Sequence, residues 1–382
     1  MAKKRFVVIG VHGWFPSKFV LRSVVGEPTG TSAKFCDETA KAIRHYFEVE
    51  HELTLPLECI TLIPLQWEGK VMDRVDKLYH FLVDNPASLE AVKTADVIFW
   101  TTHSQGTPVS TILMDRLLDE NLIQLHRQPV CFLAMAGIAH GPFPYLKGNL
   151  IVKYFEADAA RELFDFMDSK SDISQRFHQA LASILRQGVK TILVGSMQDQ
   201  VVPLYSAIMA NAQHPNILRA LYVDGHVYSD DDFLINLIVF ALRLRNAGLS
   251  DHGLLLHTSE VLAGNLYAWE GGHSTIYEEP SVYSLAPTLL FNTAPVGPLV
   301  RSPQQHGPST QKDAKLDAFT ARTRWNPYYL TWAMRGIFDD PQINQHFSQD
   351  LDRLRHLFDG WHPSSTKLRE IKFRLEPIKA RL

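Results

Sequence analysis

A serine between a predicted strand and a predicted helix is the feature that most constrains the fold of this chain. Residues 95–101 (Ala-Asp-Val-Ile-Phe-Trp-Thr) are apolar and β-rich and predict a buried strand, and residues 107–119 predict an amphipathic helix. Between them, residues 102–106 read Thr-His-Ser-Gln-Gly. A sharp turn here pushes Ser104 out of the sheet, as in a nucleophile elbow with Thr102 where glycine is usual. The pattern predicts a nucleophilic serine, although an ordinary junction in which Ser104 caps the helix also fits.

An oxyanion-binding loop is predicted near the start of the chain. Residues 4–11 predict a strand, and residues 12–16 (His-Gly-Trp-Phe-Pro) follow it. Acyl transfer needs backbone N–H donors aimed at the developing oxyanion. In α/β hydrolases, which this arrangement resembles, one donor belongs to the residue after the nucleophile and the other to a His-Gly loop after an early strand. Here these donors would be the amides of Gln105 and Trp14, with Phe15 as the alternative to Trp14. The Trp14 and Phe15 side chains would form an apolar wall beside the acyl group of a substrate.

An aspartate follows a later strand. Residues 190–195 (Lys-Thr-Ile-Leu-Val-Gly) predict a strand, and the loop after it, residues 196–203, contains Asp199. An acid in this place would orient a catalytic histidine, in the chain order Ser, Asp, His. The alternative is that Asp199 is an Asx-turn residue, which is common in loops.

Two histidines are candidates for the catalytic base. His226 lies between a strand predicted over residues 217–223 and a helix predicted over residues 231–246. His273 lies later, in the sequence Trp-Glu-Gly-Gly-His-Ser of residues 269–274, where two glycines would give a mobile loop. We take His273 as the base and keep His226 as the alternate base.

These motifs together resemble the α/β-hydrolase superfamily of lipase and serine-esterase type, over residues 4–246, or to residue 274 if His273 is the base. The Gly-Gly-His-Ser run and the tyrosine-rich residues 276–283 are similar to those of uncharacterised fungal hydrolase-like proteins. The resemblance implies an α/β fold with a mostly parallel sheet flanked by helices. It also implies a triad of Ser104, Asp199 and His273, an acyl-enzyme intermediate, no cofactor and no metal.

Composition excludes several other classes. The net charge of −3 and the dispersed basic residues give no nucleic-acid footprint. Three cysteines, Cys36, Cys59 and Cys131, predict neither a disulfide framework nor a metal site and favour a reducing compartment. The first core strand begins by Arg5, which leaves no room for a signal peptide, and no apolar run is long enough to span a membrane. We therefore expect a cytoplasmic protein.

The chain is expected to have three parts. Residues 1–292 form the hydrolase domain, in which residues 139–187 are a helical lid insertion. Residues 293–316, rich in Pro, Gln, Ser and Gly, are a linker or long loop. Residues 317–382 are a helical C-terminal extension whose last helix is basic and amphipathic. These C-terminal helices are candidates for peripheral membrane or protein contact, although a helix docked on the core is the commoner outcome.

The leading function is hydrolysis of a carboxylic ester. The expected substrate is a small-molecule ester or acyl compound, and an apolar acyl group is favoured. An acyltransferase or thioesterase would use the same triad. A hydrolase-fold protein without catalysis, acting through its C-terminal helices, is the alternative from another class.

Overall fold

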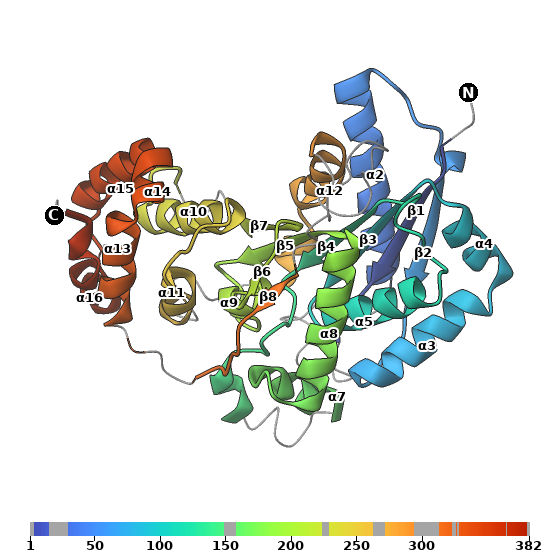
Figure 1. Cartoon of the computed structure of the whole chain (residues 1–382), viewed down its shortest axis with the longest axis horizontal. Helices are drawn as coiled ribbons and strands as arrows, with labels where there is room; N and C mark the ends of the chain where they lie inside the picture. Colours follow the sequence, from blue (N-terminus) through green and yellow to red (C-terminus); the bar gives the residue numbers. More distant parts are fainter. Residues whose placement is uncertain are drawn as a thin grey trace, which may run out of the picture.

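A six-stranded parallel sheet forms the centre of the protein in a computed structural model (Figure 1). The structure describes residues 4–14, 30–148, 158–223, 229–262, 272–293, 313–322, 326, 328–363 and 365–379. Its strands, in spatial order, are β2 (Ile60–Leu65), β1 (Phe6–Val11), β3 (Val97–His103), β4 (Val130–Met135), β5 (Lys190–Ser196) and β7 (Ile217–Tyr222). All pair in parallel, so the loops that follow their carboxyl ends meet at one edge of the sheet.

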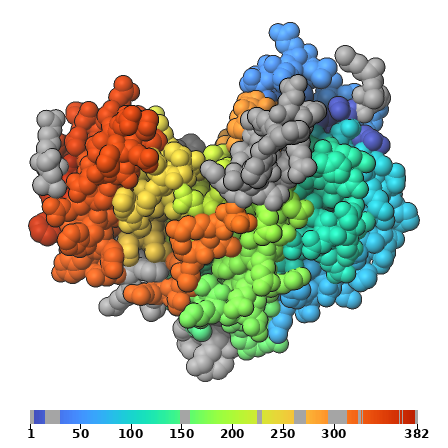
Figure 2. Space-filling model, in the orientation of Figure 1, coloured from blue at the N-terminus to red at the C-terminus, as the bar shows by residue number. Residues whose placement is uncertain are grey.

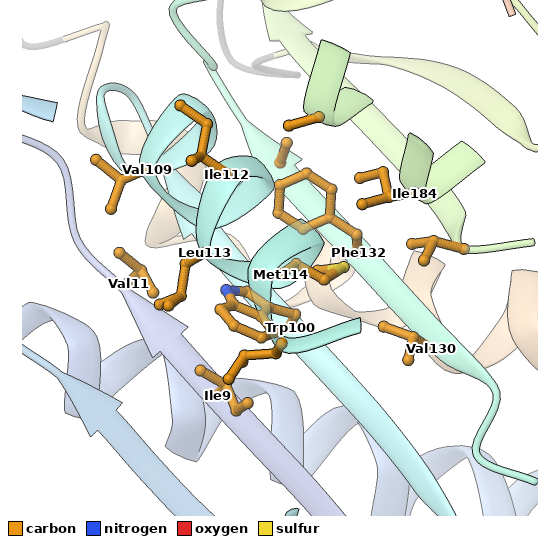
Figure 3. Packing of buried hydrophobic residues seen from close by; sticks show 14 of the residues in the cluster. Ile9, Val11, Trp100, Val109, Ile112, Leu113, Met114, Val130, Phe132 and Ile184 are labelled. Atoms are coloured by element: carbon orange, nitrogen blue, oxygen red, sulfur yellow. The ribbon is translucent and has the colours of Figure 1, made fainter. Parts of the chain in front are cut away.

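One face of the sheet is covered by helices that follow β2, β3 and β4. Ile9 and Trp100 from the strands pack here with Leu113 and Met114 from the central helix, as Figure 3 shows. Residues at alternate strand positions pack on this face because successive side chains of a strand point to opposite faces. The helices are α3 (Val71–Val83), α4 (Pro86–Thr94), α5 (Gly106–Asp119) and α8 (Asp172–Gln187).

The opposite face is covered by α2 (Thr31–His51) and α12 (Pro280–Asn292), which lie side by side. Val8 and Phe99, the strand neighbours of Ile9 and Trp100, pack on this face. The tyrosine-rich segment contributes the short helix η4 (Thr275–Tyr277) and the start of α12, and the Tyr283 hydroxyl donates to the Tyr277 carbonyl over 2.7 Å. The segment just after His273 is therefore held against the sheet.

A second group of helices packs around its own apolar core beside β7. Phe233 and Leu237 from the helix after β7 contact side chains such as Phe358 in this core. Figure 2 shows the atoms of this part of the chain, coloured yellow to red, as a lobe at the left of the molecule. They are α10 (Phe233–Asn246), α11 (Leu254–Leu262), α13 (Tyr329–Asp339), α14 (Pro341–His346), α15 (Ser348–Gly360) and α16 (Thr366–Arg374).

The last basic helix, α16, docks on this core through Leu368 and Ile371. Exposed aromatic side chains remain on the lobe, among them Trp332 and Phe373. Within the described residues, no helix combines the length and the apolar character that a membrane crossing would require. Contact of the C-terminal helices with a membrane or a protein stays an expectation.

Shorter elements complete the structure. Residues 315–316, the end of the segment expected as a linker, form β8, which pairs antiparallel with β6. Residues 294–312 of that segment lie outside the described residues. The remaining elements are η1 (Leu57–Cys59), η2 (Pro144–Gly148), α7 (Asp158–Glu162), η3 (Leu163–Met167), α9 (Leu204–Ala207), β6 (Ala212–Gln213), β8 (Lys315–Leu316) and η5 (Glu376–Lys379).

Asn85 and Pro86 begin α4 directly after α3, because the Asn85 side chain accepts from the Ala87 and Ser88 amides and Pro86 occupies the first helical turn. In the segment expected as a lid, α8 lies against α5, and its Phe177 belongs to the main core of the sheet. Part of that segment therefore belongs to the helix layer that covers one face of the sheet.

Candidate active site

Ser104 lies in the turn between β3 and α5, directly after the last residue of the strand. Its φ is 55°, in the left-handed region that is unfavourable for a side chain other than glycine. Its amide donates to the Met135 carbonyl at the end of β4 over 3.0 Å, and its carbonyl accepts from the Thr107 amide. Strain of this kind persists only where the surroundings enforce it, and it is frequent at functional sites.

Gly106 and Thr102 explain why this turn is so tight. A Cβ on Gly106 would lie 2.3 Å from Thr102 Oγ1 and 2.6 Å from the Val11 carbonyl oxygen, so only glycine fits where α5 crosses the end of β1. The Thr102 hydroxyl donates to the same Val11 carbonyl over 2.9 Å. The threonine is accommodated because its one polar group is satisfied.

The loop after β1 lies directly against the serine. A Cβ on Gly13 would be 2.8 Å from Ser104 Cβ and 3.2 Å from the His103 carbonyl oxygen. Trp14 is half-buried in this loop, and Phe15 lies outside the described residues. Gln105 follows Ser104 at the start of α5, and Trp14 follows Gly13 in the loop that packs against the serine. The two residues whose amides are expected to bind an oxyanion thus lie in the segments that meet at Ser104.

Asp199 and His273 meet at the same edge of the sheet. His273 Nδ1 lies 2.7 Å from Asp199 Oδ2, and each side chain is only 1% exposed. Asp199 Oδ1 accepts from the Val201 and Val202 amides, each over 2.8 Å. The carboxylate is therefore fixed by its own loop and keeps its second oxygen for the imidazole.

The loop that carries His273 is pressed against the loop that carries Asp199. A Cβ on Gly272 would lie 2.0 Å from the Gln198 carbonyl oxygen, so a residue with a side chain does not fit at this position. The alternate base His226 lies outside the described residues. Of the two candidate histidines, the structure describes only His273, and it lies against Asp199.

His103 links the serine turn to His273. Its ring lies 4.5 Å from the His273 ring, centroid to centroid, and its Nε2 is 2.9 Å from the His273 carbonyl oxygen. The ring points away from Ser104, toward Phe35 and Tyr277. Burial, followed by the neighbouring His273, holds the pKa of His103 well below its usual range. His103 is therefore a neutral packing residue at pH 7.

His12 is buried at the start of the loop after β1. Its amide donates to Ser32 Oγ over 3.0 Å, and its Nδ1 lies 2.5 Å from the Gly13 carbonyl oxygen. Burial and then the Arg74 charge lower the pKa of His12 to about 3, so the ring is neutral at pH 7. The His12 residue therefore keeps the start of the loop after β1 in place.

Arg74 is a charged residue next to the serine turn that is not among the site residues predicted from the sequence. It lies on α3 and is fully buried, and its guanidinium contacts Gln105 and the carbonyl of His12. The signal in the sequence is an arginine at helical spacing among the apolar positions Val71 and Leu78. An arginine there predicts a buried polar partner but does not identify it.

No group of three or more His, Cys, Asp or Glu side chains in the described residues is arranged to hold a metal ion.

A mostly parallel sheet flanked by helices, with a serine turn after its central strand, defines an α/β-hydrolase fold. A family profile described as the YMC0/YMC35 alpha/beta hydrolase domain matches residues 1–341. The chain belongs to this family of α/β hydrolases.

Solved structures of lipolytic proteins match parts of the chain. Phospholipase PlaB from Legionella pneumophila is 15% identical at a TM-score of 0.35, with 55% of this chain and 46% of that chain covered. The chain thus spans less than half the length of that phospholipase. No curated protein matches the chain in sequence.

Two further structures come from other sources. A chain from the structures of LipS and LipT, two metagenome-derived lipolytic enzymes, is 11% identical at a TM-score of 0.33, with 63% of this chain and 94% of that chain covered. A lipase-esterase related protein from Clostridium acetobutylicum is 13% identical at a TM-score of 0.30, with 58% of this chain and 87% of that chain covered. Similarity this remote carries no argument about this chain.

Proposed function

We propose that the protein is a serine hydrolase that cleaves a carboxylic ester, with Ser104 as nucleophile, His273 as base and Asp199 as the acid that orients it. The observation that carries the proposal is the buried Asp199–His273 hydrogen bond beside the strained serine turn. An ordinary Asx turn explains the contacts of Asp199 with the amides of its own loop. It does not explain a histidine from 74 residues away on the other carboxylate oxygen.

The hydrogen bond sets the protonation of the imidazole. A carboxylate only accepts, so the ring nitrogen that faces Asp199 carries the proton. In neutral His273 the proton is then on Nδ1, and Nε2 keeps a lone pair that can accept a proton. This is the tautomer that a general base for a serine hydroxyl needs.

The reaction then has two steps. In the first, Ser104 Oγ attacks the ester carbonyl while His273 Nε2 takes the hydroxyl proton, and the imidazolium is stabilised by Asp199. The amides of Trp14 and Gln105 bind the oxyanion of the tetrahedral intermediate, which collapses as His273 returns the proton to the leaving alcohol. In the second step, water attacks the acyl-enzyme by the same route and releases the acid.

An acyltransferase or a thioesterase would use the same residues, because the acceptor of the acyl group is decided by access to the acyl-enzyme and not by the triad. An apolar acyl group is favoured by Trp14, which is half-buried and follows Gly13 in the loop that packs against the serine. A hydrolase-fold protein without catalysis is the alternative from another class. Activity measurements separate these functions.

The test is labelling with a fluorophosphonate probe, followed by hydrolysis of p-nitrophenyl esters of increasing chain length. The variants are Ser104→Ala, His273→Ala and His226→Ala, with Ser281→Ala, at an exposed serine of α12, as the matched control. Labelling that is lost in Ser104→Ala and in His273→Ala, but kept in the other two, supports the proposal.

Loss of labelling in His226→Ala, with labelling kept in His273→Ala, would transfer the role of base to His226. A folded wild-type protein that neither labels nor hydrolyses any ester of the series would refute the proposal and favour the non-catalytic alternative. Release of the acyl group to an added alcohol or thiol in preference to water would identify an acyltransferase.

A further inference from the structure

Arg74 is a fully buried arginine on α3. Its side chain is fully buried at the start of α3, on the helix face that packs into the main core. No carboxylate within the described residues forms an ion pair with it. A guanidinium in such surroundings is unfavourable unless its N–H groups are well bonded, so its contacts indicate its role.

Those contacts join two separate parts of the chain. Arg74 Nη1 donates to Gln105 Oε1 over 2.7 Å, and Arg74 Nη2 donates to the His12 carbonyl oxygen over 2.8 Å. Gln105 is the residue after the serine, and His12 begins the loop that contains Trp14. One planar guanidinium therefore bonds both segments that supply the expected oxyanion donors.

The surrounding contacts hold this bridge in place. Gln105 Nε2 donates to the Gly69 carbonyl over 3.1 Å, which ties the serine turn to the residues just before α3. The Val71 amide at the start of α3 donates to a carboxylate oxygen of Glu162 over 2.7 Å. Burial lowers the pKa of Arg74 to about 10, against an opposing effect of the Glu68 charge. The guanidinium thus remains protonated at neutral pH.

We propose that Arg74 is the positioning residue of the oxyanion hole. Its guanidinium holds the loop that carries the Trp14 amide against the turn that carries the Gln105 amide, so that both donors are in place before the oxyanion forms. The inference rests on the proposed function and adds the residue that organises the donors. Arg74 itself is buried and acts through its two neighbours.

The proposal differs from a purely structural role in what it predicts for the transition state. Preorganised donors stabilise the oxyanion and not the planar ester, so loosening them lowers kcat and leaves KM nearly unchanged. Complete removal of one oxyanion donor lowers kcat by roughly 10²–10³-fold in a well-studied case. Arg74→Met displaces the donors without removing them, and we expect a loss of about 10–100-fold in kcat.

The experiment compares Arg74→Met and Arg74→Lys with Lys77→Met, which removes a cation from the exposed face of the same helix. Lysine keeps the charge but is shorter and presents a single nitrogen, so it cannot reproduce the geometry of the two bonds from Nη1 and Nη2, and its kcat should lie between those of wild type and Arg74→Met. Each variant is assayed for kcat, KM, thermal unfolding and inhibition by a trifluoromethyl ketone, whose serine adduct carries an oxyanion.

We expect the ketone to lose affinity by the same factor as kcat/KM, with KM within about threefold of wild type. If Arg74→Met does not fold, Arg74→Lys and Gln105→Leu carry the test, because each removes one of the two bonds. A purely structural role predicts a lower unfolding temperature, with kcat and ketone affinity of the folded fraction unchanged.

The outcomes separate this inference from the proposed function. An active wild type with Arg74 variants that match Lys77→Met in kcat and in ketone affinity would overturn the role of Arg74 and leave the serine hydrolase intact. A wild type that neither labels nor hydrolyses an ester would overturn both.

Discussion

Asp199→Asn is the substitution that tests the proposed chemistry most directly. The asparagine oxygen can still accept from the Val201 and Val202 amides, so the loop should keep its shape. The other carboxylate oxygen, 2.7 Å from His273 Nδ1, becomes an NH₂ group that donates. The imidazole must then carry its proton on Nε2, and the lone pair that should receive the serine proton is lost.

The expected effect on catalysis is large, and the effect on folding is small. In a serine protease with the same three groups, this change lowers kcat by about 10⁴-fold. That factor corresponds to about 5.4 kcal/mol of transition-state stabilisation at about 1.36 kcal/mol per factor of ten. Unfolding should become easier by only about 1 kcal/mol, because a hydrogen bond to a charged group is replaced by one between neutral groups.

The assay is single-turnover and steady-state hydrolysis of a p-nitrophenyl ester, with urea unfolding on the same samples. Asp165→Asn, at an exposed aspartate, is the matched control and should leave kcat and stability unchanged. A folded Asp199→Asn protein that keeps more than a tenth of the wild-type kcat would refute the idea that Asp199 determines the tautomer of the base.

Three further predictions concern the packing of the site and the core. Gly272→Ala should lower kcat at least tenfold, because its Cβ would lie 2.0 Å from a backbone oxygen of the Asp199 loop. Gly360→Ala, which has open space around its Cβ, is the control and should leave kcat unchanged in the same assay. Burial, followed by the nearby His178, lowers the pKa of His140 to about 3, so between about pH 6.5 and 3 the unfolded chain binds a proton that the folded protein does not. The unfolding free energy should therefore fall on acidification through this window, by up to about 1.4 kcal/mol per pH unit. In His140→Phe, the unfolding free energy, measured by urea titration at several pH values, should depend less steeply on pH. Trp100→Ala should destabilise the fold by about 3–5 kcal/mol in urea titrations, since the ring fills the centre of the main core (Figure 3), and a loss below 1 kcal/mol would contradict that packing.

Local patterns in the sequence predict the main elements around the site. The strand over residues 190–195 corresponds to β5, and the helix over residues 107–119 to α5, each within a residue or two. Such segments are readable because apolar periodicity reports which side of an element is buried. The turn at Ser104 can be predicted for the same reason, because only five residues lie between the predicted strand and the predicted helix, and the chain must change direction within them.

The sequence by itself therefore determined the alternation of strands and helices and the place of Ser104 between them. Only the tertiary structure placed His273 against Asp199, because a contact across 74 residues depends on how two loops meet at one edge of the sheet. The same holds for Arg74, whose partners are 31 and 62 residues away in the chain. A charged side chain on an apolar helix face is stable only where distant backbone and side-chain groups satisfy it, and no local pattern specifies those groups.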